Sequence, residues 1–399
     1  MSRLQKAFVG VGVAVALAIG SGAAFAQTAP APPPDGATPS EGQAPPPATP
    51  APDPAPDTKA AIASFFKGTE VGGLLDVNYD WYSTRQDGDA LYRNFDTRHN
   101  QFRLGMAQLY ITKAPSAESR VGFKLKVSGG PATNIVQSGE PGGPSVLNNI
   151  EEGYVSYLVP AGKGLQFDVG KFVTPLGAEV IEAKDNWNYS RSLLFSLAIP
   201  YYHSGVRMTY APNAKLSLIG MVVNGWNNVN ENNTAKTIGG EIAYKPSGSF
   251  SIVENYIAGP EQPANNDDWR QVSDTIATVT VNPAFSLMAN YDYGKDTFAG
   301  EGVHWQGLAA YAKIQGKRVA LSPRFEWYDD PQGASTGTPQ TLNEFTTTFE
   351  VKATDTFLFR IEYRGDWSDS AVFKNGDGDY QKTQRSIAFG LLYSFSLKS

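Results

Sequence analysis

The residue types that could carry out catalytic or metal chemistry are few and scattered in this chain. It has no cysteine and three histidines, His99, His203 and His304. None of the histidines lies in a zinc-binding spacing or near a nucleophile elbow. We therefore interpret each as an ordinary polar residue of a loop or strand end and expect no enzyme activity, with a hydrolase kept as an alternative. Without cysteine, disulfides and thiolate metal sites are excluded.

Two Asp- and Gly-rich runs, at 87–89 and 375–379, are superficially similar to calcium loops. They lack the twelve-residue ligand spacing that ends in glutamate, so turn formation is the better explanation. We expect no cofactor and no metal. The formal net charge of −6, without a clustered basic surface, also argues against a nucleic-acid partner.

Most ionisable residues instead alternate with apolar ones. Lys124 and Lys126, for example, alternate with Phe123 and Leu125. Successive residues of a strand point to opposite faces, so one face of each strand is polar and the other apolar. The basic residues expected on the polar, lumen-facing wall are Lys124, Lys126, Arg207, Arg324, Arg360 and Arg364.

Burying so many charges away from water would be prohibitive. The pattern therefore predicts a water-filled bore lined by charged side chains, with the alternating apolar side chains in contact with lipid.

A long connection at residues 173–201 has the composition of a segment that packs against something. It carries several large apolar residues, which an external loop has little reason to contain. We expect it to fold into the lumen and to present charged residues to the opening, in opposition to the basic wall. The residues expected at this constriction are Glu179, Glu182, Lys184, Asp185 and Arg191. An ordered external hairpin over the mouth remains the alternative.

The elements that would position these residues are strands. Alternation with a period of two recurs in about sixteen segments between residues 70 and 397, although it is weak in the second, fourth, ninth and tenth. Most are as long as the roughly 9–11 residues that a tilted membrane-spanning strand needs. The sequence thus predicts an all-β fold, a transmembrane antiparallel barrel.

The connections favour such a barrel over a soluble sheet. Short Pro- and Gly-containing turns follow the even-numbered segments, and longer polar connections follow the odd-numbered ones. Aromatic residues fall near strand ends, so we expect two girdles at the membrane surfaces. Trp81, Trp305 and Trp367 would lie in the outer girdle, and Tyr244 and Tyr311 in the periplasmic one.

The N-terminal residues are typical of export. Residues 1–26 have a positive start, a short apolar run and small residues before a cleavage site after Ala26, which indicates a signal peptide. Residues 27–59 are rich in Pro and Ala and are expected to form a disordered periplasmic segment. The barrel would occupy residues 60–399.

Several stretches resemble the OmpL-like putative β-barrel porin family. The run from Gly170 to Tyr210, with its DNWNYSRSLLF centre, is the most specific, and VNGWNN at Val223 to Asn228 is also similar. The resemblance extends over roughly Phe65 to Phe395 and implies an outer-membrane porin. It assigns no functional role to any residue of this sequence. Many outer-membrane proteins end on the aromatic residue that is read during their assembly. In this chain four residues follow Phe395.

Together these features predict a porin of the outer membrane that lets small hydrophilic solutes or ions diffuse passively through the constriction at 173–201. The expected partners are lipopolysaccharide and other outer-membrane lipid, the solutes, and, by analogy with sixteen-stranded porins, two further copies in a homotrimer. A structural or adhesive barrel without a conducting pore is the alternative.

Overall fold

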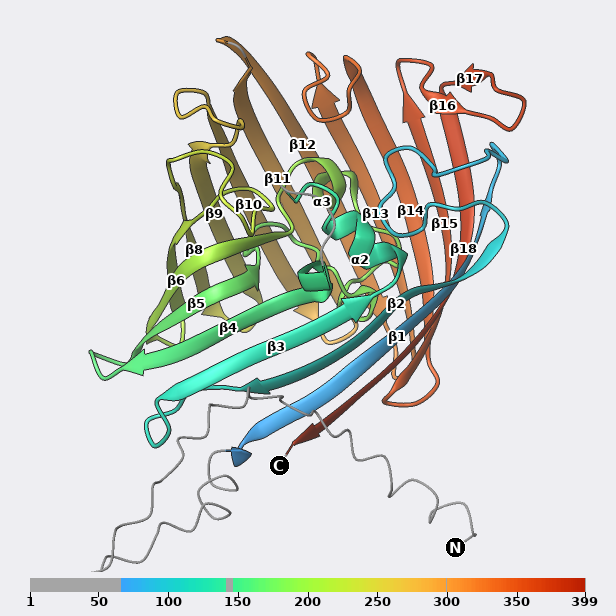
Figure 1. The fold of residues 1–399 in the computed structure, drawn as a ribbon. Helices are drawn as coiled ribbons and strands as arrows, with labels where there is room; N and C mark the ends of the chain where they lie inside the picture. The colour runs from blue at the N-terminus through green and yellow to red at the C-terminus, as the bar shows by residue number, and fades with distance from the viewer. Residues whose placement is uncertain (1–65, 141–145, 299, 399) are drawn as a thin grey trace, which may run out of the picture. The chain divides into compact units, whose positions relative to one another are not determined.

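The structure is a computed structural model that describes residues 66–140, 146–298 and 300–398. Sixteen antiparallel strands form a closed barrel, in which each strand pairs with its neighbours along the chain and β1 closes against β18 (Figure 1). The expected signal peptide and the Pro/Ala-rich segment lie outside the described residues. Among the described residues, no helix is long and apolar enough to cross a membrane.

The first eight barrel strands are β1 (Thr69–Tyr82), β2 (Gln101–Lys113), β3 (Val121–Gly129), β4 (Ile150–Val159), β5 (Leu165–Val173), β6 (Tyr202–Asn213), β7 (Leu216–Val223) and β8 (Thr237–Ser247). The other eight are β9 (Phe250–Pro260), β10 (Trp269–Asn282), β11 (Phe285–Phe298), β12 (Glu301–Gln315), β13 (Val319–Asp330), β14 (Gln340–Lys352), β15 (Phe357–Ser368) and β18 (Thr383–Lys398). The predicted all-β barrel is confirmed, and each of the sixteen predicted segments corresponds to one of these strands.

Short helices and one small hairpin occupy the connections. The helical turns are α2 (Pro131–Val136), η2 (Val146–Asn149), η3 (Ala183–Asp185) and α3 (Leu193–Leu197), and the hairpin is β16 (Phe373–Lys374) with β17 (Tyr380–Gln381). Asn375 forms the turn of this hairpin, since its side chain accepts the backbone N–H groups of Asp377 and Asp379. Turn formation thus accounts for the Asp/Gly-rich run there.

The alternation of short and long connections is present with one exception. The turns after even-numbered strands are short, and the connections at 83–100, 130–149 and 174–201 are long. The exception is the connection after β11, which ends at Phe298, because β12 already begins at Glu301.

The two faces of the strands divide as the periodicity predicts. On β18, Ile387, Phe389 and Leu391 are exposed on the outer face, and Ala388 and Leu392, at alternate positions, are buried. Bulges interrupt the alternation in β2 and β4. The one at Gly105 in β2 places Gly105 and Met106 together on the inner face, and the one in β4 does the same for Glu151 and Glu152.

Two aromatic residues expected in the girdles point inward instead. Trp305 and Tyr311 are buried on the inner face of β12, which is the opposite face from the one expected. The inner wall is apolar there because it packs against a loop inside the barrel, as described below. Trp81 and Trp367 are on the outer face near the outer ends of β1 and β15, and Tyr244 is on the outer face near the periplasmic end of β8.

The assignment of faces predicts opposite responses to a buried charge. Leu391 lies on the outer face in the middle of β18, so Leu391→Arg should lower the free energy of unfolding of the barrel in lipid vesicles by about 2–4 kcal/mol. Ser217→Arg, on the inner face of β7, should leave this free energy nearly unchanged, because the lumen contains water. Denaturant titration in vesicles measures both, and equal losses would contradict the assigned faces.

Candidate functional site

The loop after β5, residues 174–201, enters the barrel and is called here the constriction loop. It carries η3 and α3, and α3 lies against β12 and β13 (Figure 1). Its backbone is hydrogen-bonded to side chains of the inner wall at several points, so it lies within the lumen. The alternative of an external hairpin is thereby excluded.

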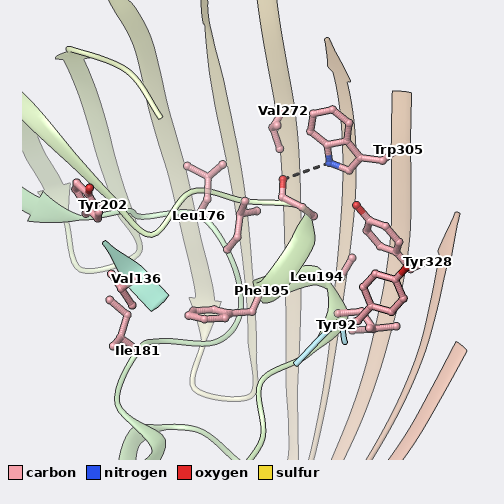
Figure 2. Close-up of a cluster of buried hydrophobic side chains, with 14 of the residues drawn as sticks. Tyr92, Val136, Leu176, Ile181, Leu194, Phe195, Tyr202, Val272, Trp305 and Tyr328 are labelled. Carbon is pink, nitrogen blue, oxygen red and sulfur yellow. Dashed lines mark hydrogen bonds between the residues drawn. The ribbon is translucent and has the colours of Figure 1, made fainter. Parts of the chain in front are cut away.

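The apolar side of the constriction loop packs on the inner wall of β10 to β14. Leu194 and Phe195 of α3 belong to one buried cluster with Val272, Trp305 and Tyr328 (Figure 2). The Trp305 indole donates a hydrogen bond of 3.3 Å to the carbonyl of Ala198 at the end of α3 (Figure 2). This contact explains why Val272, Trp305 and Tyr328 interrupt the otherwise polar inner wall of these strands.

Acidic side chains of the wall accept the backbone N–H groups of the constriction loop. Glu326 on β13 accepts those of Leu193 and Leu194, at 2.8 and 3.2 Å. Glu362 on β15 accepts those of Tyr189 and Ser190, at 2.6 and 2.9 Å. Each carboxylate thus binds two consecutive amides.

The carboxylate of Asp274 extends this pattern to β10, because it accepts the N–H of Gly177 at 2.8 Å. Three wall carboxylates therefore hold the constriction loop along its length.

Arginines of the same wall donate to the carbonyls of the constriction loop. Arg360 donates to Ala183 and Asn186, at 2.6 and 2.7 Å. Arg324 donates to the Ser190 carbonyl at 2.9 Å, and Arg364 donates to that of Arg191. An irregular segment inside a barrel has no strand neighbours for its backbone groups, and buried polar groups without partners are costly. The charged wall supplies these partners.

These contacts correct the expected role of three basic residues. Arg324, Arg360 and Arg364 face the lumen as predicted, but the constriction loop covers them and each is about 1% exposed. Their charges are paired with Glu344, Glu350 and Asp366. They hold the loop in place and do not border the opening.

Two of the five residues expected at the constriction have their charged groups bound within the loop or by the wall behind it. Arg191 donates to the carbonyls of Val180 and Ile181, and Glu179 binds Arg324 and accepts the N–H of Ser192. Both side chains are buried. They keep the two arms of the loop together. Glu179 also lines the cavity described next, whereas Arg191 does not, so the expectation of a place at the opening is corrected for Arg191 alone.

The other three, Glu182, Lys184 and Asp185, lie on the free side of the loop, at a cavity of about 560 Å³. Lys184 and Asp185 are paired with each other, with the Asp185 side chain 52% exposed. The opposite side of the cavity is formed by β2 and β3, including Lys124 and Lys126. This cavity therefore brings the loop's charged tip and the wall's lysines together.

A compact ion cluster joins the loop to the wall of this cavity. Lys126 pairs with Glu182 at 2.5 Å and with Glu151 and Glu152 of the β4 bulge, at 3.2 and 2.8 Å. Burial alone would raise the pKa of Glu182, but the Lys126 ammonium and hydrogen bonds from Lys126 and Gln108 lower this pKa to about 2. The cluster thus favours the ionised form of Glu182.

Two further wall cations remain accessible. Lys124 pairs with Glu152 at 2.6 Å while its side chain is 25% exposed, and Arg207 pairs with Asp168 at 2.8 Å with 16% exposure. The open part of the lumen therefore lies along β2 to β6, and the packed part along β10 to β15.

The histidines have structural partners. His203 is buried, with its two ring nitrogens hydrogen-bonded to the Gly225 carbonyl and the Thr174 hydroxyl. His99 accepts the N–H of Tyr82 through Nδ1. Within the described ranges, no group of three His, Cys, Asp or Glu side chains is arranged to hold a metal ion.

The sequence reasoning missed the contribution of the first long connection. Arg93 pairs with Asp366 at 2.7 Å and also with Asp96, and Asn94 donates to the hydroxyl of Tyr201. Phe95 packs edge-on against Phe195. The run at 90–96 mixes large apolar residues with a single arginine, a weaker form of the signal that singled out residues 173–201.

A closed, sixteen-stranded antiparallel barrel with an apolar outer face, a charged inner face and an inward loop is the architecture of outer-membrane porins. A profile of the family described as putative beta-barrel porin-2, OmpL-like matches residues 68–395. The chain therefore belongs to this family, and it forms a porin channel of the outer membrane.

Solved structures show the same fold. The outer-membrane channel DcaP of Acinetobacter baumannii has a TM-score of 0.56 with 11% sequence identity, covering 82% of this chain and 97% of that one. The anion-selective porin from Comamonas acidovorans has a TM-score of 0.56 with 12% identity, covering 82% and 99%. OmpT of Vibrio cholerae, in its trimer form, has a TM-score of 0.56 with 10% identity, also covering 82% and 99%. None of the proteins with curated descriptions matches the chain.

The anchoring of the constriction loop by Glu362 can be tested by one isosteric change. In Glu362→Gln an amide NH₂ faces one of the two backbone N–H groups, so one hydrogen bond is lost and the anchor weakens by about 1–3 kcal/mol. We expect a larger and noisier single-channel conductance in planar bilayers. Glu241→Gln, on the inner face of β8 away from the loop, is the matched control. An unchanged Glu362→Gln trace, or the same change in the control, would refute the anchor.

A second variant tests the fit of the loop against the wall without changing charge. A Cβ atom at Gly390 would lie 2.6 Å from the ring of Tyr189, whose hydroxyl is held by Asp76. Gly390→Ala should therefore displace the loop and increase its cleavage by added protease, whereas Gly129→Ala, with open space around it, should not. Equal resistance of the two variants to the protease would show that the loop accommodates the added methyl group without being displaced.

Proposed function

We propose that the protein is a passive diffusion channel for small hydrophilic solutes and ions, with its passage between the constriction loop and strands β2 to β6. The observation that supports this most directly is the charge-lined cavity of about 560 Å³ at the free side of the loop. Charged side chains with a quarter or more of their surface exposed require water around them.

Opposed charges across this passage would act as the selectivity filter. Lys124 faces the passage from β3, and Glu182, Lys184 and Asp185 face it from the loop. Side chains of opposite charge at a narrow point create a transverse field that discriminates among solutes by charge and dipole. In this proposal the lysines of β3 provide the positive wall, and not the arginines of β13 and β15.

A change of sign at the passage should change ion selectivity. Lys124→Glu with Lys184→Glu converts two positive side chains to negative ones, so we expect the reversal potential under a salt gradient to move toward cation preference. Lys236→Glu, in the connection after β7, is the control for a charge change away from the passage. A reversal potential shared by the double variant, the control and the unchanged protein would place the filter elsewhere.

A liposome-swelling assay separates the proposed channel from a purely structural or adhesive barrel. Vesicles that contain the channel should swell in small sugars at a rate that falls with sugar size. A barrel without a conducting passage would give no swelling and no conductance steps.

We propose no catalytic activity for the chain. The support is the pairing of His203 with a backbone carbonyl and a threonine hydroxyl, which suits a role in fixing the start of the constriction loop. Absence of hydrolysis of ester and peptide substrates by the purified barrel would agree with this proposal.

The assembly and export of the chain complete the proposal. We infer cleavage of a signal peptide after Ala26, a Pro/Ala-rich periplasmic segment at 27–59, contact of the barrel with lipopolysaccharide, and a homotrimer. The trimer is supported by the fold shared with Vibrio cholerae OmpT, which is described in a trimer form. N-terminal sequencing of the mature protein and the mass of its detergent-solubilised form test these points.

A further inference from the structure

The outer face of β9 to β12 carries a polar region where lipid contact would be expected. Glu254 on β9 has the same orientation as the exposed residues Ile252 and Tyr256, so its carboxylate lies on the outer face. It accepts the hydroxyls of Ser273 and Thr275 on β10, at 3.0 and 2.5 Å. A charged side chain among lipid-facing residues is rare and unfavourable, and usually marks a functional site.

The polar region continues beyond Glu254 onto the neighbouring strands. Tyr256 donates its hydroxyl to the amide oxygen of Gln271 at 2.7 Å, and Tyr291 on β11 does the same to Gln306 on β12 at 2.9 Å. We call these residues, with Ser273 and Thr275, the outer polar face: Glu254, Tyr256, Gln271, Ser273, Thr275, Tyr291 and Gln306. By contrast, the outer faces of β15 and β18 present apolar and aromatic residues such as Ile361 and Leu391.

A groove lies directly beside this face. It has a volume of about 380 Å³ and is bordered by Ile238, Ile242, Glu254 and Tyr256. Gly240 lies in it, and on β7 the outward position opposite is Gly220. Because neither glycine has a side chain, a protruding side chain from another molecule can approach the backbone closely.

The hydrogen-bonding groups of the outer polar face complement one another across two copies. The Glu254 carboxylate is an acceptor with capacity beyond its two hydroxyl partners. Gln271 and Gln306 accept from tyrosine through their oxygens, so their NH₂ groups keep the capacity to donate to another partner. Lipid chains offer no partner for either kind of group. A second copy of the same face offers both.

We propose that the outer polar face of β9 to β12, with the adjacent groove, is the surface through which copies of this chain contact one another in the outer membrane. This rests on the proposed oligomeric state and names the surface that forms it. The carboxylate of one copy would accept from the glutamine amides of the next, and apolar side chains would fill the groove at Gly240.

The first test replaces Ala277, an outward residue two positions from Thr275, with the photoreactive amino acid benzoylphenylalanine. Ile361 on β15 receives the same replacement as the control. Irradiation of intact outer membranes should give a covalent product of two chains at Ala277 and none at Ile361. Cross-linking at Ala277 to lipopolysaccharide or to a different protein alone, or two-chain product at Ile361 alone, would overturn the proposal.

The second test uses Glu254→Leu, with Thr347→Leu on the outer face of β14 as the matched control. Loss of the carboxylate should lower the temperature at which the detergent-solubilised oligomer dissociates, and the control should not. If Glu254 faced lipid, leucine would suit its surroundings better, and an oligomer as stable as the unchanged one would refute the proposal.

The outcome is separable from that of the proposed function. Conductance per barrel should be the same in Glu254→Leu, because the residue lies outside the lumen. A chain that conducts without two-chain cross-linking at Ala277 refutes the interface alone, and one that cross-links without conducting refutes the channel alone.

Discussion

The structure depends on the way that the backbone of the constriction loop obtains hydrogen bonds inside the barrel. Strands satisfy their backbone groups with their neighbours, but an irregular segment in the lumen has none, and buried N–H and C=O groups without partners are costly. Glu326 and Glu362 accept the amides of the loop, and Arg360 donates to its carbonyls. Hydrogen bonds that involve a charged group are stronger than neutral ones, so a few wall residues can hold a loop of 28 residues at 174–201.

This arrangement divides the lumen into two unlike halves. On the wall from β10 to β15, the charged side chains bind the loop or pair with one another, as Arg364 does with Asp366. These charges are therefore buried and inaccessible to solutes. The wall from β2 to β6 keeps accessible charges, because only the tip of the loop reaches it through the Lys126 cluster. In the proposed channel, selectivity would therefore depend on a few residues on one side, although charged residues occur on both.

The architecture was readable from the sequence because a closed barrel repeats one rule, alternation, on every strand. The site was readable only in part. Composition showed that residues 173–201 must pack, but periodicity gives the face of a residue and not whether a loop covers that face. The inner-wall position of Arg324 and Arg360 was therefore predicted correctly, but their exposure to the passage was not. Trp305 was misplaced for a related reason, since its aromatic character suited a girdle equally well, and only its contact with Ala198 reveals the inner side.

The positions where alternation is weak are the informative ones. In β4 the bulge turns Glu151 and Glu152 to the same face, and this doubling provides the carboxylates that hold Lys126. On the inner face of β10, Val272 packs in the same apolar cluster as the loop. On its outer face, Ser273 and Thr275 donate hydrogen bonds to Glu254. A strand that contacts only lipid on one side and water on the other must alternate strictly. A strand that departs from this rule is expected to have a protein surface on at least one side. For β10 this is the loop on the inside, and the proposed contact between copies would supply it on the outside of β9 and β10.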